Sequence, residues 1–195
     1  MGQPTPSVES NSDEMRTSSR PWVKELLDWV KTLAVALAIV LSLHLFVFNL
    51  STVEGHSMEP TLHAKEWLFV NKAVFLFGSP ALGDVIIVKD PEIGPSGKDY
   101  LVKRIIGVPG DIIEIRNRQL YRNNELIVER YTDNPIDGQD MAAVEVGEGS
   151  YFLMGDNRHA HASRDSRSFG TVPRDQIMGR ADIILWPITK MTFLK

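Results

Sequence analysis

Residues 54–62, EGHSMEPTL, place a serine, Ser57, in a short polar segment close behind a long apolar run. A serine hydroxyl becomes a nucleophile for acyl transfer only when a nearby base removes its proton. The nucleophile turn of an α/β-hydrolase reads Gly-x-Ser-x-Gly, and here Glu59 stands where the second glycine would be. Ser57 is therefore a candidate nucleophile of another class, and its base has to be sought elsewhere.

Histidine is one candidate for that base. A Ser-His-Asp arrangement stays open, although the spacing selects none of the histidines beyond the apolar run, which are His56, His63, His159 and His161. The zinc-protease motif His-Glu-x-x-His is absent, and the pair His159-Ala-His161 has no third ligand in view. The chain has no cysteine, which excludes disulfides, thiolate metal sites and a cysteine nucleophile. We expect no metal and no cofactor.

Lysine can replace histidine as the base if burial keeps its amine neutral. Lowering a lysine pKa from about 10.4 to about 8 requires roughly 3 kcal/mol of selective destabilisation of the charged form. In the apolar segment YLVKRIIGVPGD, alternation places Lys103 with Leu101 and Ile105 on one side and Arg104 on the other. The pattern does not say which side is interior, but a guanidinium is effectively never deprotonated, which favours Lys103. Lys89, at the end of DVIIVK, is the weaker alternative.

A third segment, MGDNRHAHASRDSRSFGTVP at residues 154–173, is dense in Gly, Asp, Asn, Ser and Arg. Such side chains bond to nearby backbone in turns. The segment is therefore either a structural loop held by a pair such as Asp165 with Arg167 or a part of the site.

A membrane anchor precedes these segments. Residues 33–50 are 18 residues without a formal charge, about 27 Å of helix against a hydrocarbon core of about 30 Å. A cleavable signal peptide would have a shorter apolar region and small residues at the cut. A buried core helix would be unusually uniform around its circumference, since Ser42 and His44 are the only polar side chains in the run. Residues 1–32 form a tail that is largely disordered by composition, with a possible short amphipathic helix just before the span.

Flanking charge predicts the orientation. Four basic residues precede the span, whereas Lys65 is the one Lys or Arg in the fifteen residues after Leu50; the four are Arg16, Arg20, Lys24 and Lys31. We expect the N-terminus in the cytoplasm and residues 51–195 outside.

Residues 51–195 predict a mainly β domain, built as partly closed, barrel-like sheets. Short β-branched or aromatic runs alternate with Gly, Pro, Asn or Asp; the runs are WLFVNKAVFLF, DVIIVK, YLVKRIIGV, DIIEIRN, QLYRN, ELIVE, SYFLM and ADIILW. Residues 108–111 predict a turn, Asn123-Asn124 predicts a hairpin tip, and 132–143 a surface loop. Residues 67–78 are apolar enough either for core or for contact with a bilayer.

Taken together, these segments resemble a type I signal peptidase of peptidase family S26, the Ser/Lys membrane protease that removes signal peptides from exported proteins. The single span with a short basic tail is similar to the forms of Gram-positive bacteria. The segments that carry the resemblance, in order, are the span, GHSMEPTL, GDVIIVKDP, YLVKRIIGVPGD and MGDNR with SRDSRSFG.

The resemblance implies a β-rich catalytic core and a role for each matching residue. Ser57 matches the nucleophile and Lys103 its general base. Ser163 matches a serine that orients the lysine amine. The other matching residues are Met58, which packs beside the dyad, Gly155 and Asp156 in the turn next to the lysine, and Asp165 and Arg167, which fix their loop. It also implies exported preproteins with signal peptides as substrates, contact with the lipid bilayer, and small side chains at the first and third positions before the cut.

Two departures from the family pattern affect the site. Many Gram-negative members carry a serine two residues before the nucleophile, where its hydroxyl helps to bind the oxyanion, and this chain has Gly55. The oxyanion would then be bound chiefly by the Ser57 backbone N–H and another amide. The second departure is the segment HAHA between Arg158 and Ser163, which is about two residues longer than usual and weakens the assignment of Ser163.

Two other classes of protein share parts of this pattern. Self-cleaving repressors share Ser/Lys chemistry but need a DNA-binding domain, for which the N-terminal tail is too short. The net charge of −4 also argues against nucleic acid as a partner. A catalytically silent, membrane-anchored binding or scaffold protein of the same fold would not need Ser57 and Lys103 together.

Overall fold

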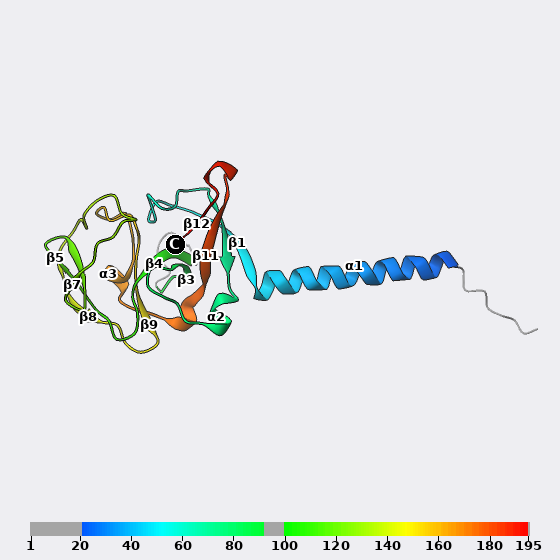
Figure 1. Cartoon of the computed structure of the whole chain (residues 1–195), viewed down its shortest axis with the longest axis horizontal. Coiled ribbons are helices and arrows are strands. Elements are labelled where there is room, and N and C mark those ends of the chain that lie inside the picture. Colours follow the sequence, from blue (N-terminus) through cyan, green and yellow to red (C-terminus); the bar gives the residue numbers. More distant parts are fainter. Residues whose placement is uncertain (1–20, 92–99, 195) are drawn as a thin grey trace, which may run out of the picture. The chain divides into compact units, whose positions relative to one another are not determined.

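The computed structural model describes residues 21–91 and 100–194 (Figure 1). The chain divides into two units, Met1–Leu41 and Ser42–Lys195. The disorder expected for the first part of the tail falls on residues 1–20, outside the described residues.

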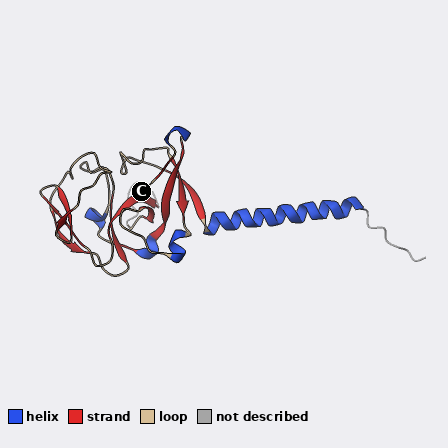
Figure 2. Cartoon of the chain, in the orientation of Figure 1, coloured by secondary structure: helices blue, strands red, loops and turns tan. Residues whose placement is uncertain are grey.

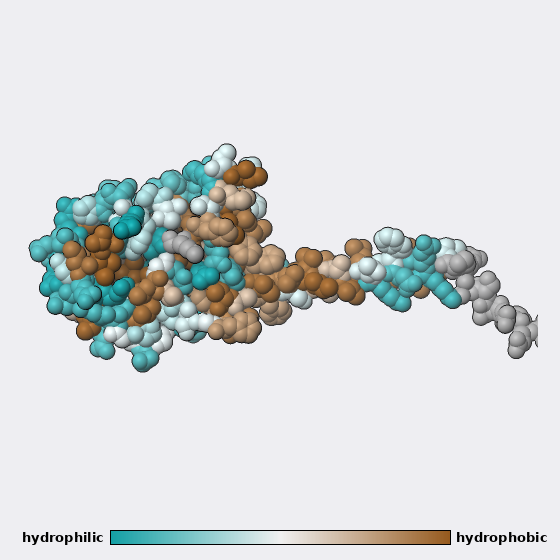
Figure 3. Space-filling view, viewed as in Figure 1, coloured by the Kyte–Doolittle hydropathy of each residue, from teal (hydrophilic) through white to brown (hydrophobic). Residues whose placement is uncertain are grey.

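The long helix α1 runs from Pro21 to Phe46, and its stretch Trp22–His44 is long and apolar enough to cross a membrane. None of the apolar window is buried, and apolar residues cover much of the helix surface (Figure 3). The predicted end of the span at Leu50 is wrong, because the helix ends at Phe46, whereas the predicted start at Leu33 lies within the helix and stays a prediction. The helix already begins at Pro21, a residue favoured in the first turn, and residues beyond Phe46 instead enter a strand, β1 (Phe48–Thr52).

The second unit is built from two antiparallel sheets, which confirms the mainly β prediction (Figure 2). Sheet A has the order β1-β2-β11-β3-β4-β9-β10, with β12 on β11. Its further strands are β2 (Trp67–Asn71), β3 (Val85–Lys89), β4 (Tyr100–Gly107), β9 (Ser150–Met154), β10 (Val172–Pro173), β11 (Ile177–Trp186) and β12 (Thr192–Phe193). Sheet B has the order β7-β6-β5-β8. Its strands are β5 (Ile112–Arg116), β6 (Gln119–Arg122), β7 (Glu125–Leu126) and β8 (Met141–Glu145).

Irregularities in pairing curve sheet A. Register shifts interrupt the pairing of β11 with β2 and with β3 and that of β4 with β9, and such bulges bend strands. The helical elements of this unit are short: α2 (Val74–Phe77), α3 (Ser166–Phe169), and the 3₁₀ turns η1 (Arg174–Gln176) and η2 (Ile188–Lys190). They lie between strands, and the sheets carry the core.

Both faces of the central strands are covered. Val85 and Ile87 of β3 belong to one apolar cluster, whereas Ile86 and Val88 belong to another on the opposite face. For this reason β4 buries the side chains on both of its faces. Lys103 is 1% exposed, and Arg104, on the other face, is 2% exposed. The sequence pattern could not choose an interior side because β4 has two of them.

The turns follow the prediction. The Asp111 N–H donates to the Val108 carbonyl at 3.0 Å, which closes the turn between β4 and β5. Asn123 and Asn124 have φ of 53° and 66°, the left-handed conformation of a tight hairpin, between β6 and β7. The predicted loop at 132–143 is wrong at its end, because β8 begins at Met141 and pairs with β5.

The apolar stretch 67–78 is divided between two environments. Leu68 and Val70 of β2 are core residues, as one interpretation held. The strand ends at Asn71, whose side-chain oxygen accepts the Val74 N–H, and the chain then forms α2 instead of continuing as a strand. Phe77 on α2 is 94% exposed, which agrees with the bilayer-contact interpretation for this second half.

Candidate active site

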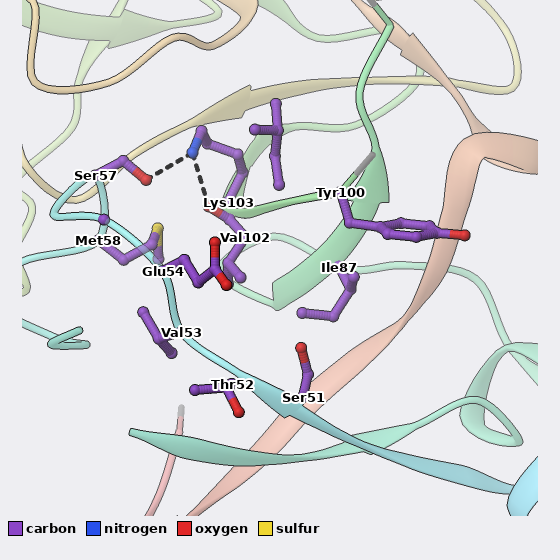
Figure 4. A pocket seen from close by; sticks show the side chains of 12 residues that line it. Ser51, Thr52, Val53, Glu54, Ser57, Met58, Ile87, Tyr100, Val102 and Lys103 are labelled. Carbon is purple, nitrogen blue, oxygen red and sulfur yellow. Dashed lines mark hydrogen bonds between the residues drawn. The ribbon is translucent and has the colours of Figure 1, made fainter. Parts of the chain in front are cut away.

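Lys103 and Ser57 are brought together from distant parts of the chain. Ser57 lies in a turn that follows β1, and β4 carries Lys103 beneath it. Lys103 Nζ donates hydrogen bonds to Ser57 Oγ at 2.8 Å and to the Val102 carbonyl at 2.8 Å (Figure 4). This geometry allows the amine to take the serine proton directly.

The environment of Lys103 favours its neutral form. Burial lowers the pKa of Lys103 from 10.5 to about 8. The Asp165 and Asp156 carboxylates act in the opposite direction on this pKa, and the Arg167 cation adds to the lowering. A lysine of this kind is available as a base in mildly alkaline solution, as the chemistry of a neutral amine requires.

A cleft of about 340 Å³ leads to the dyad. One wall is the chain from Ser51 to Gly55, the other is the start of β4 from Tyr100 to Lys103, and Met58 is buried between them (Figure 4). Residues 100–103 pair with β3 on one side, whereas pairing of β4 with β9 begins only at Arg104. Among the described residues, the first half of β4 therefore has no strand on its second edge, and this edge can pair with an added extended peptide.

Asp165 holds together the loop that contains Ser163 and Arg167. Its carboxylate accepts hydrogen bonds from the Ser163 hydroxyl at 2.7 Å, from the Gly155 N–H at 3.0 Å and from two Arg167 guanidinium nitrogens at 2.8 Å each. Burial alone would raise the pKa of Asp165, but Arg167 and these donors hold it below its ordinary value. The aspartate also caps α3 by accepting the Arg167 backbone N–H.

Ser163 has a different partner from the one that the resemblance implies. Its hydroxyl donates to Asp165, and within residues 21–91 and 100–194 it forms no hydrogen bond with Lys103. An influence of Ser163 on the lysine amine would therefore pass through the Asp165 carboxylate.

Gly155 lies where the backbone segments are in close contact. A Cβ at this position would clash with the Ser57 carbonyl and the Ser163 hydroxyl, and would lie 2.7 Å from Ser163 Cβ. We expect Gly155→Ala to lower kcat at least about tenfold, because the turn carrying Ser57 must move away from Lys103. Steady-state cleavage kinetics would measure this. Gly147→Ala is the matched control, since an added Cβ there meets nothing within 4 Å.

Arg104 and Asp156 form a buried ion pair beside the dyad, which the sequence did not predict. Asp156 accepts from Arg104 Nε at 2.9 Å and from its terminal nitrogen at 2.6 Å. The Thr61 hydroxyl donates to the same carboxylate at 2.5 Å, which links the segment of Ser57 to the neighbour of Lys103. The Tyr131 ring lies 4.1 Å from the Arg104 guanidinium carbon. In the sequence, the one indication of this ion pair is an arginine within an apolar strand, because a buried arginine needs a buried partner.

Among the described residues, no histidine side chain forms a hydrogen bond with the Ser57 hydroxyl. His56 Nδ1 is 2.7 Å from the Glu59 carboxylate, and both residues face solvent at least in part. His159 Nδ1 lies 3.2 Å from Asp137. In the part of the chain that the structure describes, the side-chain partner of Ser57 Oγ is Lys103 and not a histidine. The Ser-His-Asp alternative therefore has no geometric support.

A serine hydrogen-bonded to a buried lysine, at a cleft in a curved β fold, is the arrangement of the Ser/Lys class of hydrolases. The sequence model of the family "Signal peptidase, peptidase S26" matches residues 26–186, and the chain belongs to this family.

Relatives agree over nearly the whole chain. Signal peptidase I T of Bacillus subtilis (strain 168) is 34% identical over 94% of this chain and 96% of its own length. A signal peptidase I of Bacillus amyloliquefaciens is 36% identical over 93% of this chain and 94% of its own. The crystal structure of a signal peptidase I from Enterococcus faecalis is 31% identical, with a TM-score of 0.43, and covers 53% of this chain and 97% of that chain. Together with α1, family membership indicates a membrane-anchored serine peptidase.

Proposed function

We propose that this protein cleaves N-terminal signal peptides from exported preproteins, with Ser57 as the nucleophile and Lys103 as the general base. The observation that carries the proposal is the 2.8 Å hydrogen bond from Lys103 Nζ to Ser57 Oγ at the end of an open cleft. The names of the relatives, signal peptidase I in each case, support the choice of substrate.

The mechanism is acyl transfer followed by hydrolysis. Neutral Lys103 accepts the Ser57 proton as Oγ bonds to the scissile carbonyl carbon and the carbonyl π electrons move to oxygen. The resulting ammonium protonates the leaving amine when the peptide bond breaks. Lys103 then removes a proton from water, whose oxygen attacks the carbonyl carbon of the Ser57 ester. The ammonium returns this proton to Ser57 Oγ as the ester bond breaks, which releases the signal peptide with a new carboxylate and restores neutral Lys103. No metal or cofactor takes part in these steps.

The substrate would bind as an extended strand. The open edge of residues 100–103 and the chain from Ser51 to Gly55 flank the cleft, so main-chain hydrogen bonds can hold a peptide between them. Val53, Met58 and Ile87 contribute apolar lining. Small side chains at the first and third positions before the cut are proposed from the family resemblance alone.

The activity should depend on pH through Lys103. Because the neutral amine is the base, kcat/KM should rise about tenfold per pH unit in acid and level off above an apparent pKa near 8. Cleavage of a soluble signal-peptide substrate between pH 5 and 10 measures it. A midpoint near 6.5 would instead indicate a histidine base.

Cleavage of a preprotein by the purified full-length protein in detergent tests the function itself. The native protein should release the mature chain, and Ser57→Ala should not, while both bind the substrate. A native protein that binds preproteins but leaves them intact would favour the silent binding protein of the same fold.

The proposed orientation has the N-terminus in the cytoplasm and residues 51–195 outside. It is supported by the basic residues that precede the charge-free run at 33–50, such as Lys24 and Lys31, whereas Lys65 is the one Lys or Arg in the fifteen residues after that run. Tethering confines enzyme and preprotein to one membrane and raises their effective concentration. Protease added outside intact cells should digest residues 51–195 and spare an epitope fused to the N-terminus; loss of the epitope would reverse the orientation.

A further inference from the structure

The peptide unit between His56 and Ser57 is placed to bind the oxyanion. Gly55, two residues before Ser57, has no side chain that could donate a hydrogen bond to the oxyanion. Its φ of 89° would also strain any larger residue at this position. The Ser57 N–H itself donates to no acceptor among the described residues. It is therefore free to donate to the oxygen that becomes negative when Ser57 attacks.

The direction of this N–H is set by the carbonyl on the other side of the same peptide bond. A trans peptide is planar, so its C=O and N–H point in opposite directions. The His56 carbonyl accepts a hydrogen bond from the Asn157 side-chain nitrogen at 3.0 Å and a longer one from the Glu59 N–H at 3.2 Å. Fixing this carbonyl fixes the Ser57 N–H.

Asn157 is itself held rigidly. It is 9% exposed, and its side-chain oxygen accepts the His159 N–H at 3.2 Å, which leaves the side-chain nitrogen to face His56. Its backbone N–H donates to the Ser57 carbonyl at 3.1 Å. One residue thus contacts the carbonyls of both His56 and Ser57 from a buried position at the end of β9.

We infer that the Asn157 side chain is a positioning residue for the oxyanion donor, acting through the His56–Ser57 peptide. The inference rests on the proposed function, because it assigns a role within that reaction. Asparagine suits the position since it offers a donor to His56 and an acceptor to His159 at once. Aspartate would keep the shape and the bond from His159 but turn an oxygen toward the His56 carbonyl.

The test compares Asn157→Ala and Asn157→Asp with the native full-length protein in detergent. Loss of a whole oxyanion donor costs about 10²–10³ in kcat, and here the Glu59 N–H still holds the carbonyl. We therefore expect kcat to fall about ten- to a hundredfold in both variants, with KM within about twofold. In Asn157→Ala the pH midpoint of kcat/KM should stay in place, since no charge near Lys103 changes.

A peptide aldehyde isolates the oxyanion. Its carbonyl carbon bonds to Ser57 Oγ, its oxygen takes the place of the oxyanion, and the serine proton passes to Lys103. The aldehyde should bind the Asn157 variants about ten- to a hundredfold more weakly, while affinity for the cleaved peptide product stays the same. Thr61→Val is the matched control, because it removes the other side-chain tie between these segments and leaves the peptide unit alone. Its ratio of aldehyde to product affinity should equal the native ratio.

Two results would overturn the inference while the proposed function stood: native kcat in both Asn157 variants, or an equal loss of the aldehyde-to-product ratio in Thr61→Val, which would indicate general loosening. A native protein that fails to cleave preproteins would refute the proposed function instead.

Discussion

Replacement of Lys103 by methionine should lower kcat/KM for preprotein cleavage by at least about a thousandfold. The amine is the hydrogen-bond partner of Ser57 Oγ, and a serine without a base is a poor nucleophile. Methionine has a similar length and suits the buried site, where Lys103 is 1% exposed. Steady-state cleavage of a purified preprotein measures the loss.

Stability provides an internal check on this variant. The folded-state pKa of Lys103 is lowered from 10.5 to about 8, so the unfolded chain holds the proton more tightly between these values. Below about pH 8 the buried charge therefore lowers the free energy of unfolding by about 3 kcal/mol, and this loss is recovered as the pH rises from about 8 to above 10.5. At neutral pH, Lys103→Met should therefore unfold no more easily than the native protein. Lys89→Met, at the exposed end of β3, should keep native activity; equal losses in both variants would contradict the assignment.

Asp165 and Arg167 should shift the pH dependence in opposite directions. The Asp165 carboxylate raises the pKa of Lys103 and the Arg167 cation lowers it. Asp165→Asn should therefore move the acid limb of kcat/KM to lower pH, whereas Arg167→Met should move it to higher pH. The full pH profile of each variant measures the shift.

Asp165→Asn should also destabilise the protein by about 3 kcal/mol. The substitution leaves the Arg167 cation without its carboxylate and weakens the acceptor for Ser163 and the Gly155 N–H. Denaturant unfolding in detergent measures this loss. Asp133→Asn, on an exposed loop, should change neither the profile nor the stability. Shifts of the same sign in Asp165→Asn and Arg167→Met would contradict electrostatic coupling to Lys103.

The sequence predicted the anchor by composition but not where its helix ends. Phe48, Asn49 and Leu50 suit a helix end as well as they suit a strand. These residues form a strand because they pair with a distant segment of the chain, where Phe48 lies opposite Asn71 of β2. Long-range pairing of this kind leaves no mark on the local pattern, and for the same reason the short strands β10 and β12 were missed.

The dyad was predictable because its chemistry restricts the residue types. Alternation left Lys103 and Arg104 equivalent, and both are buried, but only a lysine can act as a base. The partner of Arg104 was not predictable, since Asp156 lies 52 residues away and reaches it through the pairing of β4 with β9. The contacts of Thr61 and Asn157 were not predictable for the same reason, because they depend on which segments the sheet places side by side.

The central claim is that a neutral lysine activates Ser57, and the titration of lysine side chains tests it most directly. The full-length protein carrying ¹³C at lysine Cε would be followed by NMR between pH 6 and 12. We predict a resonance with a midpoint near 8 that is absent from Lys103→Met. If every lysine titrated above about 10, Lys103 would be charged at the pH of catalysis, and the account of the dyad would be wrong.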